Sequence, residues 1–483
     1  MKYERKSGLA LIPFLVFIAV YIGAGIAYHD FYKFPSVTAM LFATVVAFIM
    51  SGESINERFA TFAKGAGNVD VLTMLVIYIL AGAFASVAGA VGAKDATVNL
   101  GLHLVPPSLL AAGMFMIAAF FGTATGTSMG TINLLIPVAV GVAEKGGLSP
   151  VIIIAAVVGG GMFGDNLSMI SDTTIAATRS QRVEMRDKFR VNLLIALPAA
   201  IITIVLLLIF GRPETVTPVE AGSFNFFLVL PYLTVLILAL CGMNVFLVLT
   251  IGIFFAIAVG LLFGVPSVSA EAAAAAAAGN PMGGGAVLAE SISVLANAIF
   301  NGVVGMNEVY FLTFLSSGMS ELIAKNGGIN WIIDKLRGVM KNSRSAQIGI
   351  AAMVSACDCA TANNTVAIIV AGDMAREVSH TYRVDPRRTA SLLDVFSCVF
   401  QGVIPYGAQL VAAATLANAA TSTGQVFTAA GLIGSMWYCW ILGVVGILSI
   451  FIPFADGVIR KNPWNWELDC AASEAAKKAA KGA

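Results

Sequence analysis

The residues best suited to chemistry in this sequence are carboxylates and hydroxyls that interrupt an apolar segment. In "GGGMFGDNLSMISDTT" (159–174), Asp165 and Asp172 follow a stretch of glycine and aliphatic side chains. Asp, Asn and Ser compete for the backbone hydrogen bonds of a helix, so a helix that begins before Gly164 should break here. Freed carbonyls, hydroxyls and carboxylates supply the oxygen ligands that a dehydrated small cation requires. The candidate ion or proton ligands here are Asp165, Asn166, Ser168, Ser171, Asp172 and Thr173.

A second group of hydroxyls lies in "GTATGTSMGTIN" (122–133), between two apolar arms. Its glycines let the backbone turn tightly and approach a ligand. We expect Thr125, Thr127 and Ser128 to complete the shell of the ion. Na⁺ is the only metal that the sequence predicts.

Two later segments repeat this pattern, with amides among the polar side chains. They are "CDCATANNT" (357–365) and "DVFSCVFQGVIPYGAQ" (394–409), where Pro405 and Gly407 should break a helix. Amides suit a polar organic substrate as well as an ion. The predicted second ion or substrate site comprises Asp358, Thr361, Asn363, Asn364, Thr365, Asp394, Ser397, Gln401, Tyr406 and Gln409.

The composition predicts an integral membrane protein. Of 483 residues, 58% are hydrophobic and only 11% are charged, whereas soluble domains carry about 25% charged residues. The 28 Lys and Arg balance 27 Asp and Glu, so we expect no nucleic-acid partner. The chain contains no HExxH, Walker or Rossmann motif. These observations argue against an enzyme and predict no cofactor.

Apolar runs long enough to span a bilayer alternate with two runs that fit a crossing poorly. Residues 107–145 and 346–375 each hold two apolar arms around a polar tip. Each arm is too short to cross a core of about 30 Å at about 1.5 Å per residue. We therefore expect two re-entrant hairpins, whose tips lie in protein or beside water at mid-membrane. In the helix after the first hairpin, Gly160 and Gly164 predict close helix packing.

Positive charges orient these segments. The basic N-terminus "MKYERK" (1–6) is expected in the cytoplasm. If 107–145 is a hairpin that returns to the side from which it entered, the basic segment "RSQRVEMRDKFR" (179–190) also lies in the cytoplasm. The expected all-α fold then has about ten transmembrane helices and two hairpins. Both termini are expected in the cytoplasm of a bacterial cell, with the lipid bilayer of the inner (plasma) membrane around the chain.

The two halves of the chain repeat each other. At an offset of 236 residues, Thr125 falls on Thr361 and Pro150 on Pro386, so that both hairpin tips align. Because the two hairpins enter from opposite sides, the repeats should be inverted, with broken helices at the midplane, as in secondary transporters. The expected domains are N-terminal helices (1–50), a first repeat (51–210, hairpin 107–145, broken helix 149–178), connecting helices (211–264), an external Ala/Gly-rich linker (265–288), a second repeat (289–456, hairpin 346–375, broken helix 389–416) and a cytoplasmic tail (457–483).

Four motifs resemble the NhaC-type Na⁺/H⁺ antiporter family of the ion transporter superfamily. They are "TGTSMGT" (125–131), "FGDNLSMISDTT" (163–174), "IPYGAQ" (404–409) and "ERFATFAKGAGNV" (57–69). The resemblance implies sodium-linked secondary transport, an ion and proton site in 164–174, and homodimers in many members. Asn166 and Met169 stand where the family's pattern has Lys and Pro.

These observations lead to one hypothesis and two rivals. The hypothesis is sodium-linked antiport by alternating access, in which Na⁺ and H⁺ compete for Asp165 and Asp172, since a carboxylate withdrawn from water binds protons more readily. The first rival is a Na⁺- or H⁺-coupled carrier of an amino acid or small organic anion, which the amides of the second half favour. The second rival is a channel, which inverted repeats do not favour.

Overall fold

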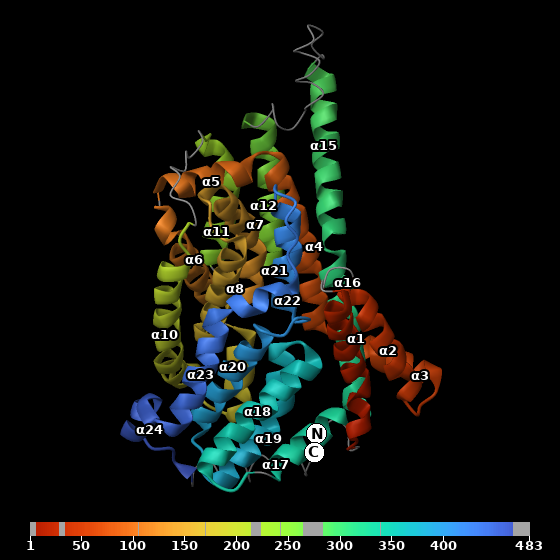
Figure 1. Ribbon diagram of the computed structural model, residues 1–483, viewed down its shortest axis with the longest axis vertical. Coiled ribbons are helices and arrows are strands. Elements are labelled where there is room, and N and C mark those ends of the chain that lie inside the picture. Colours follow the sequence, from red (N-terminus) through yellow and green to blue (C-terminus); the bar gives the residue numbers. More distant parts are fainter. Residues whose placement is uncertain are drawn as a thin grey trace.

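The computed structural model describes residues 6–28, 34–104, 106–169, 171–213, 224–241, 243–263, 284–338 and 340–466. These residues form helices and connecting segments, with no strand among them (Figure 1). Most of the expected Ala/Gly-rich linker and most of the expected tail lie outside the described residues.

The first half of the chain contributes a series of helices that ends with two apolar ones. They are η1 (Gly8–Leu11), α1 (Ile12–Tyr28), α2 (Ser36–Met50), α3 (Ile55–Ala66), α4 (Val69–Ala90), α5 (Ala93–Leu104), η2 (Pro107–Leu109), α6 (Leu110–Thr125), α7 (Ser128–Gly146), α8 (Pro150–Leu167), α9 (Asp172–Gln181), α10 (Met185–Phe210), α11 (Phe226–Leu240) and α12 (Val245–Phe263).

The second half begins with a long helix at the upper end of the molecule in Figure 1. Its elements are α15 (Gly284–Gly305), α16 (Asn307–Lys325), α17 (Gly328–Arg337), α18 (Ser343–Thr361), α19 (Asn364–Tyr382), α20 (Pro386–Gln401), α21 (Ala408–Ala420), α22 (Ala429–Leu432), η3 (Ile433–Ser435), α23 (Trp437–Phe451), η4 (Pro453–Asp456) and α24 (Gly457–Lys461).

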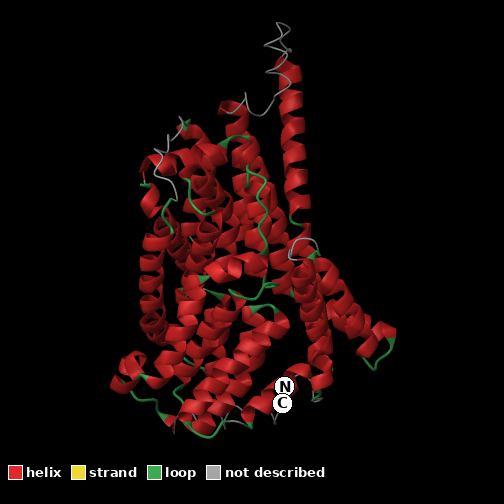
Figure 2. Ribbon diagram, in the orientation of Figure 1, coloured by secondary structure: helices red, strands yellow, loops and turns green. Residues whose placement is uncertain are grey.

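Both expected helix breaks are present. Helix α8 ends at Leu167 and α9 begins at Asp172, and the intervening backbone is extended at Ser168 and Ser171. Helix α20 ends at Gln401, and α21 begins seven residues later at Ala408. Figure 2 draws connecting segments in green half-way along the bundle, between its upper and lower helices. Backbone groups are thus freed in the interior, as the sequence predicts.

The helix boundaries of the two halves correspond at one offset. Adding 236 to the bounds of α7, Ser128 and Gly146, gives those of α19, Asn364 and Tyr382. The turns before both helices contain a residue with positive φ, Gly126 at 69° and Ala362 at 51°. The offset that aligned the polar motifs therefore also aligns the local backbone.

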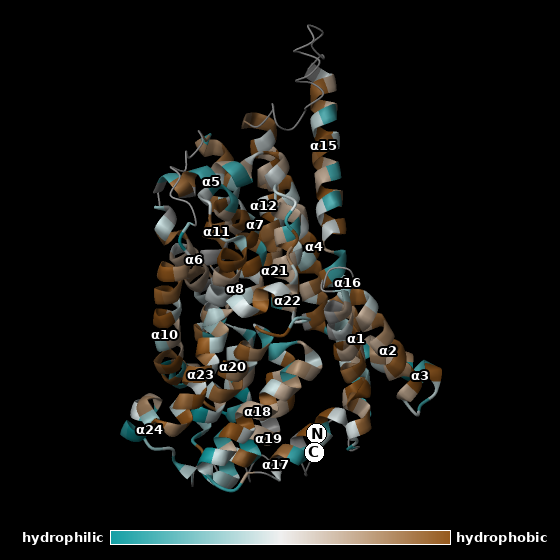
Figure 3. Cartoon of the chain, viewed as in Figure 1, coloured by the Kyte–Doolittle hydropathy of each residue, from teal (hydrophilic) through white to brown (hydrophobic). Residues whose placement is uncertain are grey.

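Apolar length and composition define a multi-pass membrane protein. Five segments of the described chain are long and apolar enough to cross a bilayer, or six if the pair 429–435 and 437–451, bent by 56°, is one span. Figure 3 shows hydrophobic residues prevailing along α10 and α2, while hydrophilic residues gather near α24 and α5. The expected number of about ten crossings remains a prediction.

Helices α6 and α8 touch backbone to backbone, as the glycine spacing predicted. A Cβ on Gly164 would lie 2.4 Å from the backbone nitrogen of Thr123 and 2.5 Å from the carbonyl carbon of Gly122. A Cβ on Gly160 would lie 2.3 Å from the carbonyl oxygen of Phe115. Neither contact can be relieved by turning a side chain, so these glycines fix the distance between the two helices.

Gly164→Ala should therefore displace α8 and strongly reduce the yield of folded protein. Overpacking of this kind typically costs about 1–3 kcal/mol. Gly113→Ala, in the first turn of α6, is the matched control, because a Cβ there has no atom of another element within 4 Å. Size-exclusion profiles and thermal unfolding in detergent measure both variants. Equal stability of the two would contradict the close packing at Gly164.

Candidate functional site

The two predicted sets of polar residues meet around one cavity of about 160 Å³. The cavity is bordered by the turns before α7 and α19, the break between α8 and α9, the break between α20 and α21, and one face of α4. Its polar lining residues are Thr73, Tyr78, Thr127, Ser128, Asp165, Ser171, Asp172, Thr173, Asn363, Asn364, Thr365, Gln401 and Gln409. Most of the predicted site residues are among them.

Asp165 is the buried carboxylate of this cavity. It lies in the last turn of α8 and is 5% exposed. Its Oδ2 accepts hydrogen bonds from the hydroxyl of Ser128 at 2.7 Å and from the backbone N–H of Ser128 at 3.3 Å. Its Oδ1 accepts from the hydroxyl of Ser171, and from that of Thr173 at 3.5 Å. Three hydroxyl oxygens thus surround one carboxylate.

The start of α7 explains why Ser128 meets Asp165. Thr127 caps this helix, because its hydroxyl accepts the N–H of Gly130 at 3.2 Å. Ser128 is the first helical residue, so its N–H has no partner within the helix. That N–H and the positive end of the helix dipole face the Asp165 carboxylate. The turn predicted from "TGTSMGT" therefore aims a helix N-terminus at the site.

Asp172 occupies a different environment. It is the first residue of α9 and lines the cavity, but its side chain is exposed. Asp165, in contrast, is enclosed by hydroxyls and is nearly inaccessible. The two carboxylates that the sequence treated as equivalent are thus a buried one and one at the rim.

The second half supplies mainly amides to the cavity. Asn363 caps α19 by accepting the N–H of Val366 at 3.0 Å. Gln401 donates to the side-chain oxygen of Gln409 at 2.6 Å. Gln409 in turn donates to the hydroxyl of Ser128 at 3.3 Å, which joins the two halves of the site.

Several predicted residues lie outside the cavity lining. The hydroxyls of Thr125 and Thr361 bond to helix carbonyls four residues earlier, Phe121 at 2.9 Å and Cys357 at 2.8 Å. Asp358 is fully buried, and neither of its carboxylate oxygens has a hydrogen-bond partner among the described residues. The others outside the lining are Asn166, Ser168, Asp394, Ser397 and Tyr406.

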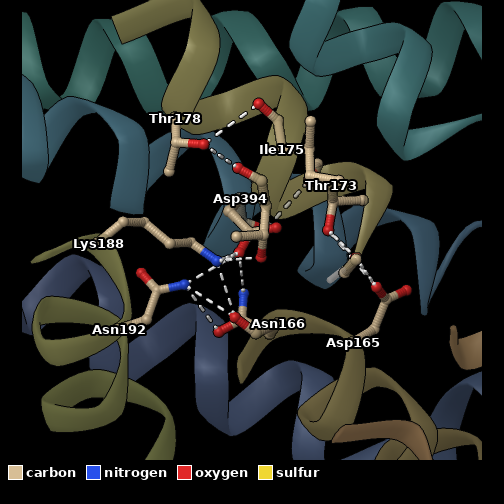
Figure 4. Close-up of polar contacts among 11 residues, drawn as sticks. Asp165, Asn166, Thr173, Ile175, Thr178, Lys188, Asn192 and Asp394 are labelled. Atoms are coloured by element: carbon tan, nitrogen blue, oxygen red, sulfur yellow. Dashed lines mark hydrogen bonds and ion pairs between the residues drawn. The ribbon is translucent and has the colours of Figure 1, made fainter. Parts of the chain in front are cut away.

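A buried ion pair lies behind the break between α8 and α9 (Figure 4). The ammonium of Lys188, on α10, contacts the Asp394 carboxylate of α20. Asn166 and Asn192 donate to the same carboxylate oxygen at 3.3 and 3.0 Å. The exposed fractions of the Lys188 and Asp394 side chains are 1% and 0%. The sequence counted Lys188 among the cations of a cytoplasmic basic segment, whereas in the structure α10 begins at Met185 and the Lys188 side chain is buried.

Sequence reasoning missed two groups of residues at the site. Thr73 and Tyr78 belong to α4, where single polar side chains in a mostly apolar run gave no signal for a polar lining. Lys188 and Asn192 share a face of α10 because they are four residues apart. That spacing was visible in the sequence, but the four arginines near Lys188 gave the segment a charge pattern typical of a cytoplasmic loop.

Broken helices whose ends meet around a buried carboxylate are the architecture of secondary transporters. The chain belongs to the Na⁺/H⁺ antiporter family, whose profile matches residues 7–212 and 216–447. No group of three or more His, Cys, Asp or Glu that could hold a metal ion occurs within the described part of the chain.

Similar proteins include both antiporters of ions and an antiporter of organic acids. The chain is 24% identical over 204 residues to the "Malate-2H(+)/Na(+)-lactate antiporter" of Bacillus subtilis, covering 42% of this chain and 43% of that protein. It is 31% identical over 120 residues to "Na(+)/H(+) antiporter NhaC" of Alkalihalophilus pseudofirmus, covering 25% of this chain and 26% of that protein. The chain thus matches less than half the length of either relative.

A longer match extends over 417 residues of an "Uncharacterized Na(+)/H(+) antiporter" of Haemophilus influenzae, with 22% identity, 83% of this chain and 87% of that protein. Among solved structures, the Alcanivorax borkumensis YdaH transporter is similar at a TM-score of 0.38 and 14% identity, over 92% of this chain and 99% of that one. A similarity at this level does not define the fold.

Proposed function

We propose that the protein exchanges Na⁺ for H⁺ across the membrane by alternating access, with Asp165 as the carboxylate that carries either ion. The observation that carries this proposal is the buried Asp165 carboxylate surrounded by the hydroxyls of Ser128, Ser171 and Thr173. A carboxylate within the membrane is energetically costly, so one that occurs there usually marks an ion or proton pathway.

Exchange follows from the chemistry of these groups. Without a cation, the hydroxyls of Ser128 and Ser171 donate to Asp165. A hydroxyl can rotate and present its lone pairs instead, so that the same oxygens surround Na⁺ beside the ionised carboxylate. A proton on Asp165 removes the charge that holds Na⁺. One group thus carries one ion at a time, which couples the two fluxes.

The remaining polar residues have supporting roles in this proposal. The exposed Asp172 at the rim attracts cations from water. Asn364, Thr365, Gln401 and Gln409 offer further oxygens on the opposite wall of the cavity. The buried Asp358 behind this wall is a second ion-binding carboxylate, and Tyr406, which donates to the carbonyl of Cys359 at 2.9 Å, holds the turn that carries it. No cofactor takes part.

A second candidate function is the coupled transport of a small organic anion or amino acid. The amides Asn364, Gln401 and Gln409 in the cavity favour it, because they could bind a polar solute. The sign of the charge disfavours an anion: Asp165 and Asp172 line the cavity, and the lining contains no Lys or Arg among the described residues. Ion exchange without an organic solute is therefore the first choice.

The architecture that we propose consists of two inverted repeats. The shared offset of helix bounds supports it, as does the placement of α7 in the upper half of Figure 1 and of α18 and α19 at its lower end. We further propose about ten crossings with two re-entrant hairpins, both termini in the cytoplasm of a bacterium, location in the inner membrane, and a homodimer.

Proteoliposomes with a trapped pH indicator test the function. An inward Na⁺ gradient should drive protons outward when no organic solute is present, and K⁺ should not replace Na⁺. Proton movement that occurs only after malate, lactate or an amino acid is added would favour the second candidate. Single-channel currents without saturation would contradict both.

A further inference from the structure

The Lys188 ammonium has the surroundings of a bound cation. It contacts the carboxylate of Asp394, donates to the carbonyl oxygen of Asn166 at 2.9 Å, and donates to the hydroxyl of Thr174 at 2.8 Å. An ammonium group has three N–H donors, so each donor has one oxygen. The three oxygens lie on α8, α9 and α20, which makes this a site built between separate elements.

The oxygens around Lys188 are of the kinds that also suit Na⁺. One is a carboxylate oxygen, one is a hydroxyl, and one is a carbonyl freed by the end of α8 at Leu167. The carbonyl of Asn166 also accepts from Asn192 at 3.2 Å, so it is held in place by α10. Asp394 Oδ1 has no hydrogen-bond partner within the described residues, and so leaves one more oxygen for a cation.

We propose that Lys188 is a tethered cation that fills a sodium site formed by Asp394, the Asn166 carbonyl and Thr174, and thereby limits how many Na⁺ ions the protein binds. Adjacent Asn166 and Asp165 face two different cation positions: Asn166 faces the one filled by Lys188, and Asp165 faces the one open to the cavity. This inference rests on the proposed function, because it takes Na⁺ as the cargo.

Equilibrium binding of radioactive ²²Na⁺ to purified protein in detergent tests the inference. Lys188→Ala should bind one more Na⁺ per chain than the wild type, because it empties the site and leaves its oxygens. Lys188→Arg, which keeps a cation, should show the wild-type number. Lys188→Ala/Asp394→Asn should also return to that number, because the carboxylate of the emptied site is gone.

Each outcome separates the inference from the function on which it rests. A wild-type protein that binds no Na⁺ overturns the proposed function. A wild type that binds Na⁺, together with a folded Lys188→Ala that binds no additional ion, overturns only the tethered-cation inference. If Lys188→Ala does not fold in the absence of Na⁺, its folding in salt decides: recovery of folded Lys188→Ala with NaCl but not with KCl supports the inference, and no recovery with NaCl contradicts it.

Discussion

Asp165→Asn should reduce Na⁺-driven proton movement about a thousandfold while the protein still folds. A unit charge about 4 Å away contributes about 4 kcal/mol at an effective dielectric constant of about 20, which is about a thousandfold in affinity. The amide has the size of the carboxylate, and its oxygen can still accept the hydroxyl of Ser128. What the variant loses is the charge for Na⁺ and the group that takes the proton.

Asp172→Asn is the matched control for this prediction. Asp172 lies on the other side of the break between α8 and α9 and lines the same cavity, but its side chain is exposed to solvent. Charges in contact with water interact weakly, by about 0–1 kcal/mol, so we expect a reduction of less than about tenfold. Transport in proteoliposomes measures both. If Asp165→Asn keeps activity within a few-fold of the wild type, Asp165 is not the cargo carboxylate.

Lys188→Ala should be the most destabilising of the charge variants, because it leaves the buried Asp394 carboxylate without its cationic partner. Removing one partner of a buried ion pair typically costs about 3–5 kcal/mol, whereas replacing both is often neutral. The double variant Lys188→Ala/Asp394→Asn should therefore recover most of the lost stability. In detergent without Na⁺, we expect the unfolding temperature to be highest for the wild type, lower for the double variant and lowest for the single variant.

Lys145→Ala controls for the loss of a lysine as such. Lys145 pairs with Asp95 at 2.8 Å, but the two side chains are 39% and 59% exposed, so this pair is worth about 0–1 kcal/mol. If Lys188→Ala is no less stable than Lys145→Ala, the buried pair does not hold α10 to α20. Added Na⁺ should stabilise Lys188→Ala more than the wild type, since a cation then replaces the ammonium.

Local chemistry in the sequence predicted the helix breaks and the turns well. The side chains of Asp165, Ser168 and Ser171 compete for backbone hydrogen bonds whatever the fold around them. Pro405 has no N–H to donate to a helix. The motif at 125–131 contains both the αL glycine and the capping Thr127 that begin α7. These features depend on neighbours in sequence, so they were readable without a fold.

Features that depend on contacts between distant segments were not readable in the same way. Asp165 and Asp172 have the same chemistry, and only packing makes one buried and the other exposed. Lys188 carries a charge typical of a cytoplasmic loop, and its burial depends on Asp394, more than 200 residues away. The lining contributed by Tyr78 is likewise set by how α4 packs against α7 and α21.

Proton release on Na⁺ binding tests most directly whether both ions use Asp165. Purified protein in a weakly buffered detergent solution is titrated with NaCl, and then with KCl as the control, while a pH electrode follows the solution. The wild type should release protons with NaCl and not with KCl, and Asp165→Asn should release none. An Asp165→Asn protein that releases as many protons as the wild type would contradict the shared site.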